Sequence, residues 1–246
     1  MVKEILCFLL NNLIFFSIIS IFLMPLTSAV VINVPSDQPT IQDAVNIAND
    51  GDIINVSAGN YTEPIISCDG DLAMFCINKS ITIKGNNLPI INGNGNDSSA
   101  FVMKRSASVS NVIIDGFEIR DFNNPGCCTG GIGSGVLAWD AGTSDIIIRN
   151  NYFHNLGWNG ILVGSDDGSI QENWTIKNNT IENSDYAGIE LTNVEKSVVM
   201  NNNVKVGSGI VWDPDDSGVG IEIAVRDHGT IVKTGDNIVQ DNFIGK

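Results

Sequence analysis

Positive charge is scarce in this sequence. It has 13 Lys and Arg residues against 28 Asp and Glu, which gives a formal net charge of −15. An acidic surface repels phosphate backbones, so nucleic acid is not an expected partner. Histidine is scarcer still, with two residues. Neither histidine lies near a cysteine pair at the spacing of zinc ligands, so no zinc site is expected.

Long apolar runs are missing except at the N-terminus. There Lys3 precedes a nearly continuous apolar stretch over residues 13–24, and the small residues Thr27, Ser28 and Ala29 follow. This order is typical of a secretory signal peptide, which we place at residues 1–29. An uncleaved anchor is the alternative, because residues 5–26 are just long enough to span a bilayer. Either interpretation predicts that residues 30–246 are exported, with membrane contact only through this segment.

Cysteine is infrequent, and signal cleavage would remove one of the five. An even number of cysteines in an exported chain predicts disulfides, with three connectivities open for Cys68, Cys76, Cys127 and Cys128. The short Cys68–Cys76 loop is the first choice, and the adjacent pair could bond to itself or elsewhere. The exported part also holds six Asn-X-Ser/Thr sequons, at Asn55, Asn60, Asn78, Asn96, Asn173 and Asn178.

Glycine and asparagine, by contrast, are abundant and recur in a repeat. An aliphatic residue is followed by a turn with Gly or Asn, and then by a second apolar residue five positions after the first. The seven copies are Val56/Tyr61, Ile83/Leu88, Ile114/Ile119, Ile148/Phe153, Ile176/Ile181, Val199/Val204 and Ile238/Phe243. Two positions after the first aliphatic residue stand Gly85, Gly116, Asn150, Asn178 and Asn201. These residue types predict a left-handed turn, and stacked copies would let asparagines hydrogen-bond from turn to turn.

A second marker follows the later copies, a glycine and an aliphatic residue that open an alternating strand. It occurs at Gly135-Val136, Gly160-Ile161, Gly188-Ile189 and Gly220-Ile221. The repeat recurs every 23 to 39 residues, about one turn of a β-solenoid, whereas a sandwich or propeller would need tight hairpins. The sequence therefore predicts an all-β protein, a right-handed parallel β-helix over residues 30–246. A strand at residues 30–34 and a short helix that begins after Thr40 are predicted to cover its first end.

The stretch from Pro39 to Glu63, PTIQDAVNIANDGDIINVSAGNYTE, resembles the opening of right-handed parallel β-helix repeat proteins of the pectin-lyase-like superfamily. That group includes NosD-like proteins and many archaeal and bacterial surface proteins. The resemblance covers residues 30 to 246 and implies the fold. It does not choose an activity, because the group contains lyases, hydrolases, esterases, epimerases and non-catalytic surface proteins.

Two glutamates are the first candidates for chemistry. Counting along the glycine-aliphatic strands, the first outward positions are Leu137, Leu162, Glu190 and Glu222. Carboxylates on adjacent turns could share a proton or a cation, which is how paired-acid hydrolases and calcium sites begin. The candidate catalytic set adds Asp167, Arg226 and His228, with an ordinary polar outer face as the alternative.

Aromatic and acidic residues near the same corners suggest binding. The predicted carbohydrate-binding residues are Trp139, Trp158, Tyr186 and Trp212. The loop after Trp212 could hold calcium through Asp213, Asp215 and Asp216, although it lacks the spacing and final glutamate of an EF-hand. An ordinary acidic loop is the alternative there. No cofactor is required by this interpretation, and calcium is the one considered.

The sequence contains only partial matches to the catalytic motifs of the enzymes in this group. Asp166-Asp167 and His228-Gly229 are similar to two polygalacturonase elements, but the flanking residues of both are absent. We therefore expect a secreted or cell-surface scaffold that contacts a polysaccharide or a cell-envelope component without catalysis. The alternative is a polysaccharide lyase or glycoside hydrolase with its site on the acidic face. A NosD-like role in metal delivery is disfavoured by the shortage of histidine and of Met-rich runs.

Overall fold

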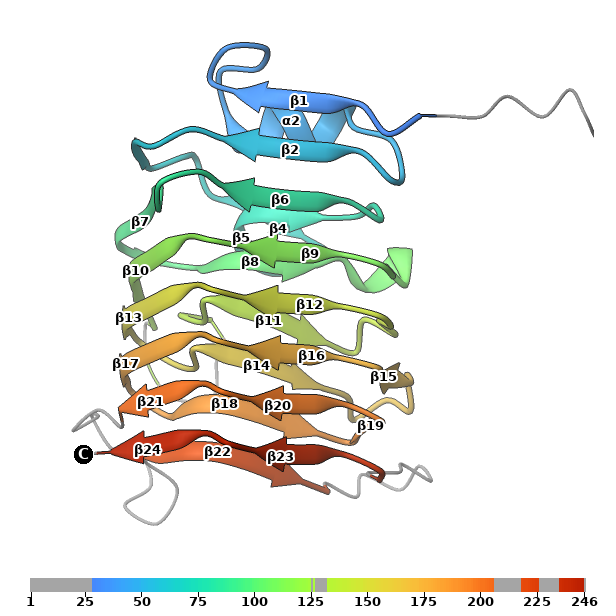
Figure 1. The fold of residues 1–246 in the computed structure, drawn as a ribbon, viewed down its shortest axis with the longest axis vertical. Coiled ribbons are helices and arrows are strands. Elements are labelled where there is room, and N and C mark those ends of the chain that lie inside the picture. The colour runs from blue at the N-terminus through green and yellow to red at the C-terminus, as the bar shows by residue number, and fades with distance from the viewer. Residues whose placement is uncertain (1–27, 125, 127–131, 206–217, 226–234, 246) are drawn as a thin grey trace, which may run out of the picture.

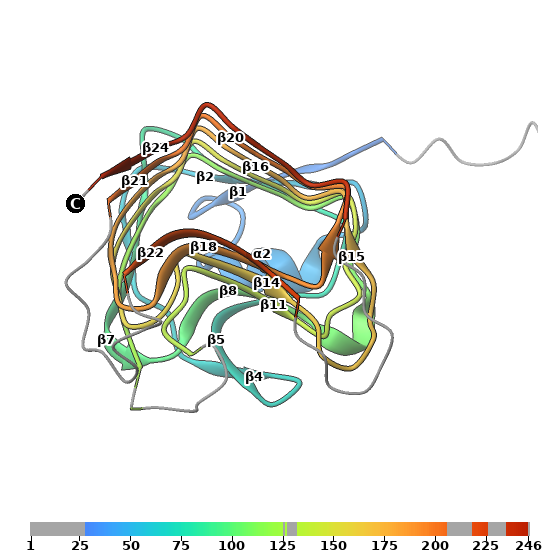
Figure 2. The ribbon, with the colours of Figure 1, turned by 90° about the horizontal axis from the view of Figure 1, so that it is seen from below.

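The chain runs through three long sheets of parallel strands, which stack along one axis (Figures 1 and 2). The computed structural model describes residues 28–124, 126, 132–205, 218–225 and 235–245. In each sheet the strand order follows the sequence order, so successive turns of the chain lie side by side. All pairings in the three sheets are parallel except β4 with β5.

The elements have the following bounds. The first sheet contains β1 (Val31–Val34), β2 (Ile53–Val56), β6 (Thr82–Gly85), β9 (Ile113–Asp115), β12 (Ile147–Arg149), β16 (Thr175–Lys177), β20 (Val198–Met200) and β23 (Ile238–Gln240). The second contains β3 (Asn60–Tyr61), β7 (Ile90–Asp97), β10 (Glu118–Asn123), β13 (Tyr152–Leu156), β17 (Thr180–Ser184), β21 (Asn203–Lys205) and β24 (Phe243–Gly245). The third contains β4 (Ile66–Cys68), β5 (Asp71–Ile77), β8 (Ser99–Met103), β11 (Val136–Trp139), β14 (Ile161–Gly164), β18 (Ala187–Thr192) and β22 (Val219–Ala224). A two-stranded sheet, β15 (Gln171–Glu172) with β19 (Val194–Glu195), the helix α2 (Ile41–Ile47) and the 3₁₀ turn η1 (Arg105–Ala107) complete the described elements.

The bend between the first and second sheets uses a left-handed residue, as the repeat predicts. Gly116, Asn150, Asn178 and Asn201 have φ angles of +85°, +56°, +56° and +55°. Gly85 is different, because its φ lies outside the left-handed region. A Cβ at Gly85 would lie 2.3 Å from the carbonyl oxygen of Gly116, so close approach of the next turn requires glycine there.

An asparagine ladder is present and buried, but it is formed by the residue after each left-handed position and not by the left-handed residues on which it was predicted. Asn151, Asn179 and Asn202, each directly after a left-handed residue, are at most 2% exposed. The Nδ2 of each donates to the Oδ1 of the asparagine one turn on, at 3.2 Å, 3.0 Å and, from Asn202 to Asn242, 2.9 Å. Each Oδ1 also accepts a backbone N–H from the turn before, as in Asn151 N to Asn179 Oδ1 at 3.0 Å. The bends of successive turns are therefore tied together without unpaired amides.

The inward residues of the repeat form one continuous core. Ile114, Ile148, Ile176 and Val199 are fully buried, and so are their partners Ile119, Phe153, Ile181 and Val204. Burial of one such side chain contributes roughly 1.5–3 kcal/mol.

Two copies of the repeat are in a different register from the one predicted. Leu88 is 46% exposed, and Ile91 is the buried residue of that turn. In the last copy, the strand pairing aligns Val199 with Val239 and Val204 with Ile244, so these face inward rather than Ile238 and Phe243. In the last copy the shift is one residue, which exchanges the two faces of a strand. In the earlier copy the inward residue comes three positions later than predicted.

Helix α2 lies at the first end of the stack, where its apolar face joins the core through Ile41, Ala44 and Val45. Both of its ends have polar partners. The Glu63 carboxylate accepts the backbone N–H groups of Ile41 and Gln42, at 2.7 Å and 3.1 Å. The Lys79 ammonium donates to three carbonyl oxygens at the C-terminal end, between 2.5 Å and 3.1 Å. These charges match the helix dipole.

Among the described residues, no helix has the length and apolarity needed to cross a membrane. The predicted signal peptide lies outside them, except for residues 28 and 29.

Candidate functional site

The outward row predicted on the third sheet is formed. The strand pairing aligns Leu137 with Leu162, Leu162 with Glu190, and Glu190 with Glu222. The two glutamates therefore stand on neighbouring strands, as the sequence predicts. The row changes along the stack from apolar to acidic.

The apolar part of this outer face is buried, so the alternative of an ordinary polar outer face does not hold there. Val102, Leu137 and Leu162 pack together with Cys68 and Ala73, and all five are at most 3% exposed. Trp139 and Trp158 pack against this cluster from its sides. These residues are buried because side chains of other segments pack on them. The alternation of apolar and polar residues along one strand does not reveal such contacts.

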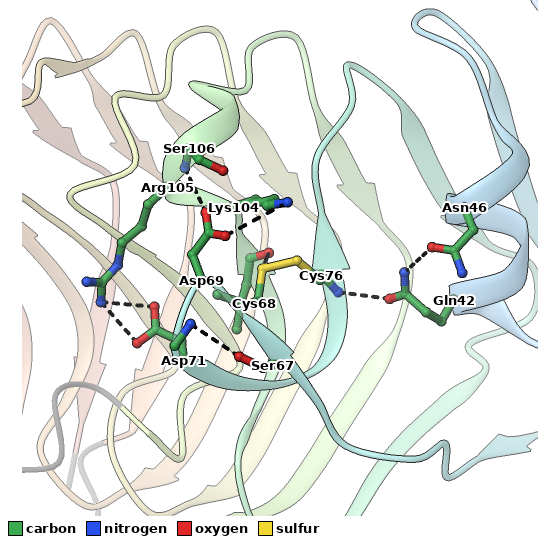
Figure 3. Close-up of a disulfide and its surroundings, with 12 residues drawn as sticks. Gln42, Asn46, Ser67, Cys68, Asp69, Asp71, Cys76, Lys104, Arg105 and Ser106 are labelled. Carbon is green, nitrogen blue, oxygen red and sulfur yellow. Dashed lines mark hydrogen bonds and ion pairs between the residues drawn. A yellow bond between two sulfur atoms is a disulfide. The ribbon is translucent and has the colours of Figure 1, made fainter.

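A disulfide holds the hairpin at one end of this face (Figure 3). Cys68 is bonded to Cys76, which confirms the first choice of pairing, and the Cys68 Sγ lies 3.7 Å from the Val102 carbonyl oxygen. Gln42 of α2 accepts the backbone N–H of Cys76 at 2.9 Å. The disulfide thus joins β4 to β5 beside the apolar cluster. Cys127 and Cys128 lie outside the described residues.

Glu190 is the most buried acid of the face, with 2% of its surface exposed. Its Oε2 accepts from Asn159 Nδ2 at 2.8 Å, and its Oε1 accepts from Thr192 Oγ1 at 2.8 Å. Two donors satisfy a carboxylate that burial would otherwise destabilise. Asn159 was not predicted. Its position directly before the glycine-aliphatic marker of β14 is the signal that could have identified it.

Two aromatic rings form a parallel pair at the start of these strands. Trp158 and Tyr186 have ring centroids 4.7 Å apart and planes 9° from parallel. Both are half-buried. The backbone fixes the pair, because Tyr186 N donates to the Trp158 carbonyl oxygen at 3.1 Å. Asn159, next in sequence to Trp158, carries the contact to Glu190.

Trp139 stands at the other end of the strands, with its ring over Gly164. A Cβ on Gly164 would lie 2.2 Å from the Trp139 ring, so the ring can take this position only against a glycine. The three described aromatics of the predicted set therefore border the outer face of the third sheet from its two sides.

An acidic corner follows Trp139. Asp140 Oδ1 accepts the backbone N–H groups of Asp166 and Asp167, at 2.9 Å and 3.3 Å. Burial, together with the nearby charges of Asp166 and Asp167, holds the pKa of Asp140 above its usual range, although these two hydrogen bonds lower it. Burial likewise raises the pKa of Asp71, which Arg105 opposes through an ion pair at 3.0 Å (Figure 3).

Asp167 itself belongs to a turn. Its carboxylate accepts from Ser169 N at 2.8 Å and from Ser165 Oγ at 3.2 Å, and it is exposed. It lies three residues after Gly164, which pairs with Thr192, whereas Glu190 lies two residues before Thr192. The structure therefore does not bring Asp167 together with the glutamate pair.

The remaining predicted residues lie outside the described residues. These are Arg226 and His228 of the catalytic set, Trp212, and the calcium candidates Asp213, Asp215 and Asp216. Within the part of the chain that the structure describes, no group of three or more His, Cys, Asp or Glu side chains is placed to hold a metal ion.

Asp185 directly precedes Tyr186 of the aromatic pair. The effect of burial on its carboxyl group can be tested by varying the pH. Burial raises the pKa of Asp185, so the folded protein binds the proton more tightly than the unfolded chain does. The ionised form therefore destabilises the fold above the folded pKa, and this cost disappears as pH falls through it. We expect Asp185→Asn to raise the melting temperature at neutral pH, with a difference from wild type that shrinks under acid conditions.

Thermal unfolding of both proteins across pH measures this difference. Asp241→Asn is the matched control, because Asp241 is exposed at a left-handed position that asparagine also tolerates. A constant difference across pH for Asp185→Asn would contradict the burial argument.

Comparison with known proteins gives a resemblance to a surface protein. No family model matches the chain. A cell surface glycoprotein of Methanothermus fervidus is 31% identical over 170 residues, covering 61% of this chain and 26% of the relative. The chain therefore spans about a quarter of that relative's length.

Proposed function

We propose that this chain is an exported, cell-surface right-handed parallel β-helix of the pectin-lyase-like type, which binds a polysaccharide or another cell-envelope glycan without cleaving it. Three parallel sheets, each of which receives one strand per turn from β6 onward, support the fold, and α2 serves as its cap. The disulfide and the surface glycoprotein of Methanothermus fervidus support export to an oxidising exterior.

The observation that carries glycan binding is the half-buried Trp158–Tyr186 pair, and Asn159, the neighbour of Trp158, is anchored by its hydrogen bond to the buried Glu190. Sugars present C–H faces that pack on aromatic rings. Partly apolar sites with a few placed polar groups are the usual form of small-ligand sites. Trp139 supplies a further ring at the other end of the same strands.

A polysaccharide panel with Trp158→Ala tests this proposal. Loss of the ring is expected to weaken glycan binding about tenfold, which corresponds to roughly 1.4 kcal/mol. Isothermal calorimetry or polymer pull-down, with and without calcium, measures it. Tyr152→Ala is the matched control, because Tyr152 stacks on His154 at 4.5 Å on the second sheet. Equal loss in both variants, or no binding to any glycan, would contradict the assignment of this face.

The pair formed by Glu190 and Glu222 suggests enzyme activity as a second candidate function. Glu190 and Glu222 on adjacent strands could act as an acid and a base or nucleophile in a glycoside hydrolase or lyase. The same panel should be followed for new reducing ends and unsaturated products. Cleavage that is lost in Glu190→Gln and in Glu222→Gln would replace the binding proposal with an enzyme.

A further inference from the structure

We infer that two of the six sequons, those of Asn60 and Asn78, are N-glycan attachment sites of the folded protein, and that the other four are closed. The inference rests on the export part of the proposed function, because the glycan donor is used on exported chains. It does not depend on glycan binding by the third sheet.

The chemistry needs two free groups on the sequon. The asparagine Nδ2 attacks the anomeric carbon of an oligosaccharide carried on a polyprenyl phosphate or diphosphate. The bond from that carbon to the phosphate oxygen breaks, the lipid phosphate leaves, and the Nδ2 proton goes to a base of the transferase. No redox change occurs. The transferase must also reach the Ser or Thr hydroxyl two residues on, because that hydroxyl defines the sequon.

Three sequons are fixed by their buried middle residue. Val56, Trp174 and Asn179 are the middle residues of the sequons at Asn55, Asn173 and Asn178, and each is at most 1% exposed. A tripeptide whose central side chain lies in the core cannot leave the surface to enter an enzyme. Asn55 is further held on both sides of its amide, by Asn33 at 3.0 Å and by Asn86 at 2.5 Å.

The sequon at Asn96 is closed at its hydroxyl. Asn96 is exposed, but Ser98 is completely buried, and so is its Oγ. Reaching that hydroxyl would require opening the start of β8, which pairs with β5 and β11.

In the sequons at Asn60 and Asn78, neither the middle residue nor the residue that carries the hydroxyl is fully buried. Asn60 lies on β3, the edge strand of the second sheet, and Thr62 is exposed with one hydrogen bond to the Asn92 carbonyl oxygen at 3.0 Å. Asn78 is exposed in the loop between β5 and β6, and Ser80 is half-buried. Both middle residues, Tyr61 and Lys79, are only half-buried.

Both sites lie on the early turns of the stack. In the strand order, β3 is the terminal strand at one end of the second sheet. β22, which carries Glu222, is terminal at the other end of the third sheet (Figure 1). Glycans at Asn60 and Asn78 would therefore leave the acidic end of the outward row uncovered.

The test offers the folded full chain to a single-subunit oligosaccharyltransferase that accepts Asn-X-Ser/Thr, with a lipid-linked oligosaccharide as donor. Intact mass and peptide mapping should show two added glycans, at Asn60 and Asn78. Thr62→Ala and Ser80→Ala should each remove one glycan while leaving the asparagine in place. Ser57→Ala and Ser98→Ala are the matched controls and should leave the glycan mass unchanged.

A urea-unfolded sample and an acceptor peptide are run in parallel. They distinguish a sequon that the fold protects from a transferase that is inactive. Modification of further sequons only after unfolding would support control by the fold. A folded chain left unmodified while the peptide is glycosylated would overturn the inference, as would a glycan at Asn55 or Asn96 in the folded protein. None of these outcomes depends on whether the chain itself binds or cleaves a glycan.

Discussion

Replacing Asn179 with alanine is expected to lower the free energy of unfolding by about 3–5 kcal/mol. The side chain makes four hydrogen bonds: its Oδ1 accepts from Asn151 N and Nδ2, and its Nδ2 donates to the Ile148 carbonyl oxygen and to Asn202 Oδ1. Asn179 is 1% exposed, so water does not replace the lost partners, and each buried group left unpaired costs about 1–3 kcal/mol.

The hydrogen bonds lost in Asn179→Ala also join the turns of the stack that lie on either side of this residue. Stability in a repeat protein is close to a sum over neighbouring turns, so a weak interface lets the two sides unfold separately. Urea unfolding followed by circular dichroism should show a lower midpoint and a broader transition. Asn178→Gly is the control, because Asn178 is exposed, glycine adopts its φ of +56° freely, and only a 3.4 Å contact to Asn150 is lost. Similar losses in both variants would mean that the buried ladder contributes little.

The ladder shows what a sequence can predict in such a fold. The repeat predicts left-handed residues at Asn150, Asn178 and Asn201 and the stacking of asparagines at the bends. It does not predict that the buried ladder is formed by the residue that follows each of them. The core residues follow from the same recurrence. Both inferences use only the period of the chain, which every turn repeats.

Features made by contacts between unlike segments were not predictable in this way. The outer row of the third sheet was located correctly, yet its burial at Leu137 and Leu162 depends on Trp139, Trp158 and the disulfide-linked hairpin. The hydrogen bond from Asn159 to Glu190 joins residues 31 apart that no repeat relates. The exchange of Ile238 for Val239 as the inward residue has another cause, because a strand with consecutive apolar residues reads equally well in two registers.

The glycines that open the strands of the third sheet have a specific packing role. A Cβ on Gly135, Gly160, Gly188 or Gly220 would come within 2.3–2.6 Å of Phe153, Ile181, Val204 or Ile244, or of a backbone oxygen. None of the four has a left-handed φ. The third sheet approaches core side chains of the second sheet so closely here that only a hydrogen fits, which explains the marker seen in the sequence.

Gly188→Ala is therefore expected to destabilise the protein by about 2–4 kcal/mol, from overpacking together with the backbone shift it forces. The added methyl carbon would lie 2.3 Å from Val204 Cγ1 and 2.7 Å from the Gly220 carbonyl oxygen, so β18 must move away from both. Because Glu190 is two residues along β18, that movement should also disturb its bond to Asn159 and weaken any ligand held there.

Urea unfolding of Gly188→Ala beside Gly235→Ala measures the effect, because a Cβ on Gly235 meets nothing within 4 Å. The double variant Gly188→Ala with Val204→Ala sharpens the test. Val204→Ala alone leaves a cavity and destabilises, but in the double variant the smaller core residue makes room for the new methyl group. We expect the double variant to lose less stability than the two single losses added together. Strict additivity would show that Gly188 is required by its backbone and not by the approach of Val204.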